Sequence, residues 1–102
     1  KVLETEFSLA FNDINPRAPH HILVIPKGPY VNFDHFILSA RNEEILDFNS
    51  TISSVIIKIK VDPCNGGKGY RLITNSGLDG VQEVPHFHVH ILGGRPLGGM
   101  LS

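Results

Sequence analysis

The segment from His86 to Leu92 carries the residues best suited to chemistry, because three histidines alternate strictly with apolar residues. Side chains of a strand point alternately to opposite faces, so the imidazoles of His86, His88 and His90 are expected on one face. Three such rings can bind a transition metal such as zinc, or can surround a phosphate with one ring as nucleophile and the others as donors. Burying them without partners costs stability, so the pattern favours a functional role over a structural one.

The loop before this segment contains groups that favour phosphate over metal. Gly77 and Gly80 allow backbone N–H groups to turn inward and form an anion-binding concavity, and Asn75 and Gln82 add neutral amide donors. Glycines alone are a weak signal, since any connection between strands uses them. Their position just before three histidines strengthens the signal, but both chemistries stay open from the residues alone.

Short elements of mixed type must position these residues. Four runs with β-branched or alternating apolar residues predict strands, each followed by turn-forming residues. These are residues 7–11, 20–25, 70–74 and 87–92. Between residues 42 and about 60, apolar residues recur at three- and four-residue steps, which predicts one long helix. Its β-branched tail leaves the C-terminal boundary loosely defined, and Pro63 and Gly66 end it.

Length, charge and hydropathy narrow the classes of protein. The chain has 102 residues, which suits one domain with one core. Its 9 Lys and Arg stand against 10 Asp and Glu and form no basic stripe, so duplex nucleic acid is not an expected partner. No apolar run approaches the roughly 20 residues of a membrane helix, so we expect a soluble protein without a membrane partner.

The cysteine content and the start of the chain carry further expectations. Cys64 has no partner for an internal disulfide, which favours a reducing, cytoplasmic setting. The first residues do not resemble a signal peptide. The sequence begins without methionine and directly with strand-like residues, so we expect that some N-terminal residues are missing from it.

The pattern at residues 86–92 resembles the His-φ-His-φ-His-φ-φ signature, with φ an apolar residue, that names the histidine triad superfamily. Residues 11–16 and 19–27 are similar to the first two strands of that family, and residues 69–72 with Asn75 and Asp79 to its third strand and phosphate loop. Together these segments cover nearly the whole chain in the expected order. The ending Leu-Gly-Gly-Arg resembles that of the Hint branch, the histidine triad nucleotide-binding proteins, and differs from the Pro-Arg of the fragile-histidine-triad branch.

The resemblance implies a catalytic role for four histidines. His88, the middle one, would attack the α-phosphorus of a nucleotide conjugate, and water would then hydrolyse the nucleotidyl-histidine. His86 and His90 would orient the reacting groups and donate to phosphate oxygens. His21 would lie beneath them on the adjacent strand, and His20 is expected at the surface. Neutral imidazole is a competent nucleophile near pH 7, because its ordinary pKa is about 6.5, and it needs its other nitrogen held, for instance by a backbone carbonyl.

The resemblance also assigns nucleotide binding to eight residues. Asp13 would accept hydrogen bonds from the ribose, and apolar residues would hold the base, while loop residues would line the phosphate and leaving group. The eight are Phe11, Asp13, Ile14, Leu23, Asn75, Val81, Gln82 and Glu83. Val81 stands where the family commonly has glycine, and Glu83 where a serine or threonine often assists the leaving amine. The chain also lacks the C-terminal tryptophan of many Hint proteins.

The resemblance implies an α+β fold, with about five antiparallel strands, one long helix on one face of the sheet, the histidines on the other, and a short helical segment. It predicts one domain over residues 1–102, in a homodimer. The expected activity is hydrolysis of purine nucleoside phosphoramidates or related nucleotidyl conjugates. The alternatives are a dinucleoside polyphosphate hydrolase and a catalytically slow nucleotide-binding regulator. The Cys-x-x-Cys of many relatives is absent, so no metal or other cofactor is expected.

Overall fold

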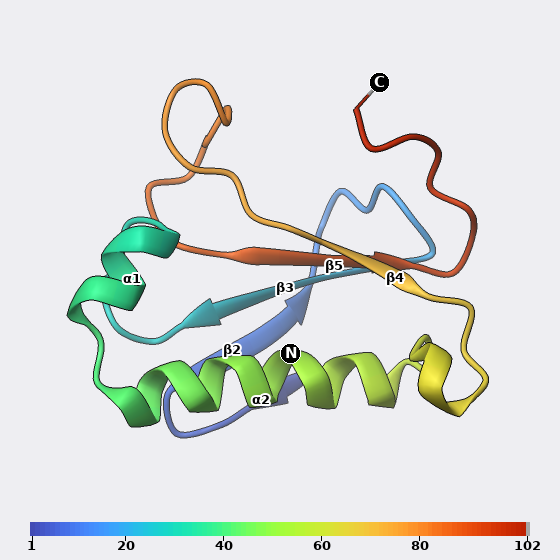
Figure 1. Ribbon diagram of the computed structural model, residues 1–102, viewed down its shortest axis with the longest axis horizontal. Helices are drawn as coiled ribbons and strands as arrows, with labels where there is room; N and C mark the ends of the chain where they lie inside the picture. The colour runs from blue at the N-terminus through green and yellow to red at the C-terminus, as the bar shows by residue number, and fades with distance from the viewer. Residues whose placement is uncertain (102) are drawn as a thin grey trace.

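The computed structural model describes residues 1–101, in which one antiparallel sheet packs against a long helix (Figure 1). The strands are β1 (Leu3–Glu4), β2 (Ser8–Asn12), β3 (His20–Pro26), β4 (Tyr70–Ile73) and β5 (Val89–Gly93). The helices are α1 (Phe33–Ser39), α2 (Asn42–Lys58) and the 3-10 helix η1 (Pro63–Asn65). Neighbours in the sheet follow the order β1-β2-β3-β5-β4, so the last strand of the chain lies between β3 and β4. This arrangement confirms the predicted α+β fold of five strands.

The predicted elements agree with the structure except at their ends. The long helix begins at Asn42 as expected and stops at Lys58, and Lys60 then takes a left-handed φ of 62°. The strand predicted over residues 87–92 begins at Val89, because the preceding residues bond to the chain beside α1 instead of to a strand, with the Phe87 N–H donating to the Tyr30 carbonyl at 2.8 Å. None of the helices within residues 1–101 is long and apolar enough to span a bilayer.

The core lies between α2 and one face of the sheet. Alternate residues of the central strands face the helix and are buried, while the side chains between them lie on the opposite face. The buried strand residues are Ala10, Ile22, Val24, Val89 and Ile91. The buried helix residues are Phe48, Thr51, Ile52, Val55 and Ile56, at the spacing that predicted the helix. The face of the sheet away from α2 is therefore left for the polar residues of β3 and β5.

An aromatic cluster joins α1 to the core and to the segment that carries the histidines. Phe36, buried in α1, lies with its ring centroid 5.2 Å from that of Phe48 and 5.2 Å from that of Phe87. Asn32 caps α1 through its side-chain oxygen, which accepts the His35 N–H at 2.9 Å. Offset aromatic pairs of this kind add to the burial of apolar area. The residue between His86 and His88 is thereby fixed in the core.

Candidate active site

The three alternating histidines are half-buried on the face of the chain opposite the core, as their spacing predicted. Phe87, between the first two, is 2% exposed, and Val89 and Ile91 are buried as well. His88 lies just before β5, and His90 lies within it, paired in register with Leu23 of β3. Burial of the apolar partners therefore holds all three imidazoles toward one side.

Backbone carbonyls determine which ring nitrogen of His86 and of His88 carries the hydrogen. His88 Nδ1 lies 2.8 Å from the His86 carbonyl oxygen, and His86 Nε2 lies 3.0 Å from the Pro26 carbonyl oxygen. A carbonyl oxygen only accepts, so each of these nitrogens donates. His88 Nε2 then carries a lone pair when the ring is neutral, which is the form that a nucleophile requires.

His21 and His90 form a direct pair between β3 and β5. The Arg17 backbone N–H donates to His21 Nδ1 at 3.0 Å, so the hydrogen of neutral His21 lies on Nε2. That nitrogen is 2.9 Å from His90 Nδ1, which therefore accepts and leaves the hydrogen of His90 on Nε2. His21 is 6% exposed, which places it beneath the triad as expected. We call His21, His86, His88 and His90 the histidine cluster.

The environment of His90 favours its neutral form. Burial lowers the pKa of His90 below 6.5, and the nearby positive charges that His88 and His21 would carry when protonated lower it further, whereas Asp13 acts in the opposite direction. The ring of His90 stands edge-on to that of His88, with the ring centroids 5.0 Å apart. A neutral His90 with its hydrogen on Nε2 can donate to a group bound beside His88.

Asp13 adjoins this cluster and raises the question of a metal. One ligand atom each from Asp13, His21 and His90 lies within 4.8 Å of the others, and an Asp13 carboxylate oxygen is 3.4 Å from His21 Nε2. Ligation through His21 Nε2 would move the hydrogen of that ring to Nδ1, where it would face the Arg17 N–H, donor against donor. The donor set therefore fits a hydrogen-bonded cluster better than a metal site.

The residues expected to hold the base lie around the row that His90 occupies. Phe11 pairs in register with Leu23, and Leu23 with His90, so these three side chains lie side by side across β2, β3 and β5 on the face away from α2. Ile14, in the loop after β2, is 92% exposed. Phe11 and Leu23 thus form an apolar strip that leads directly to the histidines, and Ile14 stands at its outer rim.

Residues 75–84, which we call the glycine loop, use several expected phosphate donors for internal contacts. The Gly77 N–H donates to Gln82 Oε1 at 3.1 Å, and Gln82 Nε2 donates to the carbonyls of Val31 at 2.7 Å and Val84 at 3.0 Å. In this structure the Gly77 N–H and the Gln82 side-chain amide bond within the protein, and their contact with phosphate stays a prediction. Gln82 instead closes the loop and ties it to the segment before α1.

The two departures from the family pattern lie at the exposed edge of the glycine loop. Val81 has a φ of 56°, a left-handed conformation that is strained for a β-branched residue and easy for glycine. Glu83 is exposed, and Asn75 is half-buried near the base of the loop. Thr74, at the start of the loop, donates through Oγ1 to the His88 carbonyl at 2.8 Å. The loop is thus attached to the backbone of His88 while its outer residues remain open to solvent.

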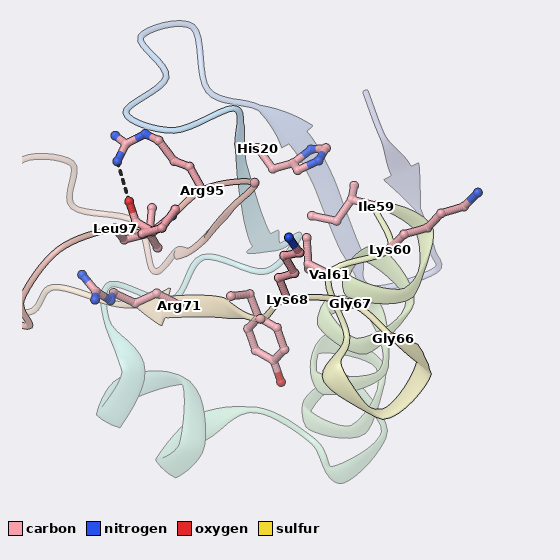
Figure 2. A pocket seen from close by; sticks show the side chains of 14 residues that line it. His20, Ile59, Lys60, Val61, Gly66, Gly67, Lys68, Arg71, Arg95 and Leu97 are labelled. Carbon is pink, nitrogen blue, oxygen red and sulfur yellow. Dashed lines mark hydrogen bonds between the residues drawn. The ribbon is translucent and has the colours of Figure 1, made fainter.

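A larger cavity lies at the other end of the sheet. It has a volume of about 790 Å³ and is formed by the start of β4, the end of α2 and the segment after β5 (Figure 2). Its lining includes His20, Lys60, Lys68, Arg71 and Arg95, and no residue of the histidine cluster. His20 therefore lies apart from the cluster, as expected from its place beside His21.

The chain is thus an antiparallel α+β domain, and its sheet presents hydrogen-bonded imidazoles on the face away from the long helix. This fold and this site together define the class as small histidine-cluster proteins. A family model described as the HIT domain matches residues 1–97, and the chain belongs to this family. A HIT-like protein of Azospirillum brasilense is 48% identical, with 100% of this chain and 80% of that protein covered. The purine nucleoside phosphoramidase of Escherichia coli is 44% identical, with 99% and 81% covered. A solved structure of a HIT family hydrolase from Clostridium thermocellum is 34% identical with a TM-score of 0.78, covering 98% of this chain and 83% of that one.

The sequence indicated which histidines lie together but missed the groups that orient them. Arg17 acts through its backbone N–H, which any residue except proline supplies, so its identity carried no signal. The Pro26 carbonyl, which accepts from His86, is equally invisible in the sequence. The turn residues around Arg17, with proline on either side of it in the chain, were the only sign that this loop has a fixed shape.

Proposed function

We propose that this protein hydrolyses purine nucleoside phosphoramidates or related nucleotidyl conjugates through a covalent intermediate on His88. The observation that carries the proposal is the hydrogen bond from His88 Nδ1 to the His86 carbonyl, which leaves Nε2 of that ring as a free nucleophile. The 44% identity to the phosphoramidase of Escherichia coli supports this substrate class.

The proposed reaction has two steps. His88 Nε2 forms a bond to the α-phosphorus while the phosphorus–nitrogen bond breaks, and the leaving amine takes up a proton from solvent. Water then attacks the same phosphorus, the bond to His88 breaks, and the nucleoside monophosphate is released with the proton of the water returned to solvent. His90, with its hydrogen on Nε2, donates to the reacting group, and His86 supports the position of His88 through its carbonyl.

The nucleotide would lie along the apolar strip with its phosphate at the histidines. Phe11, Leu23 and the exposed Ile14 would contact the base, and the Asp13 carboxylate would accept from the ribose hydroxyls. The phosphate and leaving group would then reach the glycine loop. There Asn75 and the backbone around Val81 and Gln82 shape the site, and Glu83 faces the leaving group.

Two other activities compete with this one. A dinucleoside polyphosphate hydrolase would need to place several negative phosphates near the exposed carboxylate of Glu83, which repels them. A nucleotide-binding regulator with slow chemistry would share the same cluster. The strained conformation of Val81 in the glycine loop is the observation that favours this alternative. Comparing turnover of an adenosine phosphoramidate with that of a dinucleoside polyphosphate distinguishes the phosphoramidase from the polyphosphate hydrolase. Tight monophosphate binding without turnover identifies the regulator.

The test of the proposal is steady-state hydrolysis of a fluorogenic adenosine phosphoramidate by the natural protein, by His88→Ala and by His20→Ala. We expect His88→Ala to lose turnover while still binding adenosine monophosphate in calorimetry, because the apolar strip is untouched. His20→Ala, the matched control on the same strand as His21, should keep its turnover. Full activity in His88→Ala would refute the covalent mechanism.

We also propose a homodimer formed along the free edge of β4. This strand has a partner on one side only, and beside it lies an apolar cleft of about 190 Å³ lined by residues of α1, α2 and β4. Phe33 and Leu72, which line the cleft, are 52% and 45% exposed. A second copy of the chain would cover both the cleft and the free strand edge. Sedimentation at micromolar concentration should give a dimer for the natural chain and a monomer for Leu72→Glu.

The proposed setting is reducing and cytoplasmic, without a bound metal. Cys64 is a free, exposed thiol on η1, which such a setting keeps reduced. The hydrogen bond from Arg17 to His21 supports the absence of a metal, as argued above. Elemental analysis of the purified protein should find no stoichiometric zinc.

A further inference from the structure

Both backbone polar groups of Arg17, its N–H and its carbonyl oxygen, bond to residues from different parts of the chain. Its backbone N–H donates to His21 Nδ1 at 3.0 Å, and its carbonyl accepts from Arg95 Nη2 at 2.9 Å. Arg95 belongs to the segment after β5, 78 positions away along the chain. The loop between β2 and β3 is therefore fastened to the C-terminal segment at the same residue that orients a histidine of the cluster.

Gly94 permits this contact through its conformation and its lack of a side chain. Its φ is 97°, and a Cβ built there would lie 2.8 Å from Pro19 Cβ, so the chain passes the loop too closely for any other residue. Gly93 pairs in register with His20 at the end of the β3–β5 ladder, which brings the next residues alongside the loop. Figure 2 shows the Arg95 side chain extending from this segment toward the loop, with its guanidinium also donating to the Pro96 carbonyl at 2.9 Å.

The contact at Arg17 controls a chain of hydrogen bonds that ends at the reacting group. While the Arg17 N–H occupies His21 Nδ1, the hydrogen of His21 must lie on Nε2, where it donates to His90 Nδ1. His90 then keeps its own hydrogen on Nε2. If the Arg17 N–H withdrew, His21 would be free to carry its hydrogen on Nδ1, and its Nε2 lone pair would face that of His90 Nδ1.

We propose that Arg95 is a positioning residue for the reaction: by bonding the Arg17 carbonyl it holds the loop so that the Arg17 N–H stays on His21 Nδ1. His21, and through it His90, then keeps the hydrogen on Nε2. Arg95 touches neither the cluster nor the strip that leads to it, so it acts only through Arg17. The proposal rests on the proposed function for its effect on turnover. Its effect on the hydrogen position of His21 can be measured without any substrate.

The experiment compares the natural chain with Arg95→Ala, Arg95→Lys and Arg71→Ala. Arg71 is a matched control, because its guanidinium also donates to backbone carbonyls of the C-terminal segment, those of Gly98 at 2.8 Å and Gly99 at 3.3 Å, but not to the loop. Long-range proton–nitrogen correlation spectra at about pH 8, where imidazoles are neutral, report which nitrogen of His21 carries hydrogen. Turnover of the adenosine phosphoramidate is measured on the same samples, with thermal unfolding to monitor the fold.

We expect Arg95→Ala to show hydrogen on His21 Nδ1 and to lose about fivefold in kcat with KM unchanged, since one hydrogen bond of ordinary strength is removed. Arg95→Lys should recover most of both, because an ammonium can still donate to the Arg17 carbonyl. Arg71→Ala should match the natural chain in both. A His21 spectrum in Arg95→Ala identical to that of the natural chain overturns the proposal, and so does a changed spectrum with unchanged kcat.

A failure of the proposed function gives a different result. If the natural chain does not turn over the phosphoramidate, that function is wrong, and the spectra alone then decide the role of Arg95. Hydrogen on His21 Nδ1 in Arg95→Ala but not in Arg71→Ala supports the positioning role. A His21 spectrum that is the same in Arg95→Ala, Arg71→Ala and the natural chain rejects it.

Discussion

The glycine loop leads through Pro85 into the histidine cluster, and Thr74, the residue before the loop, bonds the His88 carbonyl, yet the environments of the loop and the cluster differ. In the cluster, each hydrogen-bonded ring nitrogen meets a backbone group or another imidazole at 2.8–3.0 Å, and His21 is buried. In the glycine loop, Gln82 satisfies the inner backbone while Val81 and Glu83 face solvent, the first of them in a strained conformation.

In the function that we propose, the histidine cluster carries out the reaction and the glycine loop determines selectivity. The groups that orient His88, the nucleophile that we propose, are held by the core, so few substitutions there are compatible with both the fold and the proposed chemistry. The outer residues of the loop can change without disturbing the core, because they contact solvent. The two residues in which the chain departs from the resemblance, Val81 and Glu83, both lie in this outer part of the loop and not in the cluster.

The largest effect should come from breaking the cluster at His90. His90→Asn removes the hydrogen on Nε2 that we expect to reach the reacting group, while its amide oxygen can still accept from His21 Nε2. We expect kcat of phosphoramidate hydrolysis to fall by about a hundredfold or more, the usual contribution of a positioned proton donor. His35→Asn, a histidine of α1 outside the cluster, serves as control and should keep its kcat. Equal kcat for His90→Asn and the natural chain would remove His90 from the mechanism.

A moderate effect on selectivity should come from the charge of Glu83. Glu83→Gln removes that charge at the open edge of the loop with little change in shape. We expect kcat/KM for a dinucleoside polyphosphate to rise by about tenfold at low ionic strength, and the gain to shrink as salt is added. Glu83→Ser, measured beside it, shows whether a hydroxyl adds anything for the leaving amine of a phosphoramidate. If Glu83→Gln leaves the ratio between the two substrates as it was, the charge has no part in selectivity.

A smaller effect, on stability, should come from relieving the strain at Val81. Val81→Gly places at φ 56° the residue that adopts this conformation most easily. The relief exceeds the entropy that glycine gains in the unfolded chain, so we expect the free energy of unfolding in urea to rise by about 1 kcal/mol. Lys60→Gly is the matched comparison, because Lys60 has a similar φ of 62° without a β-branched side chain, and it should gain less. A loss of stability in Val81→Gly would show that the valine side chain makes contacts that outweigh its strain.

The smallest effect should be a pH dependence of stability that originates in the cluster. Burial lowers the pKa of His90 below 6.5, so below that pH the unfolded chain takes up a proton that the folded chain resists. The free energy of unfolding should therefore fall as the pH drops from 6.5 toward the lowered pKa, and be independent of His90 above this range. Urea unfolding at several pH values should show a shallower fall for His90→Asn than for His20→Asn. Parallel curves would mean that burial of His90 costs nothing on protonation.

The sequence predicted well where a repeating pattern reflects burial. Alternation placed the three histidines opposite Phe87 and Val89, and the helical spacing of apolar residues located α2 to within a few residues. It predicted poorly where the backbone makes the contact. The bounds of α1 were not predicted, because its seven residues are too few to establish an apolar period and only Phe36 among them is buried.

The donors of the glycine loop show the same limit. Gly77 and Gln82 are residue types that can hold a phosphate, but in the structure they bond to one another. Residue type states what a group is able to do, whereas the partner it meets depends on the whole fold. Val81, by contrast, has a positive φ, which is a physical reason for a glycine to be favoured at this position.

The position of β5 in the centre of the sheet has a consequence for folding. His21 and His90, which bond directly, are 69 residues apart in sequence, and β5, which carries His90, is synthesised after the other four strands that the structure describes. Such distant pairing makes the contact order high and the folding slow compared with a helical domain of this size. A nascent chain that ends before β5 therefore has His21 and the glycine loop but lacks His90, and the pair of His21 and His90 forms only once β5 has been synthesised.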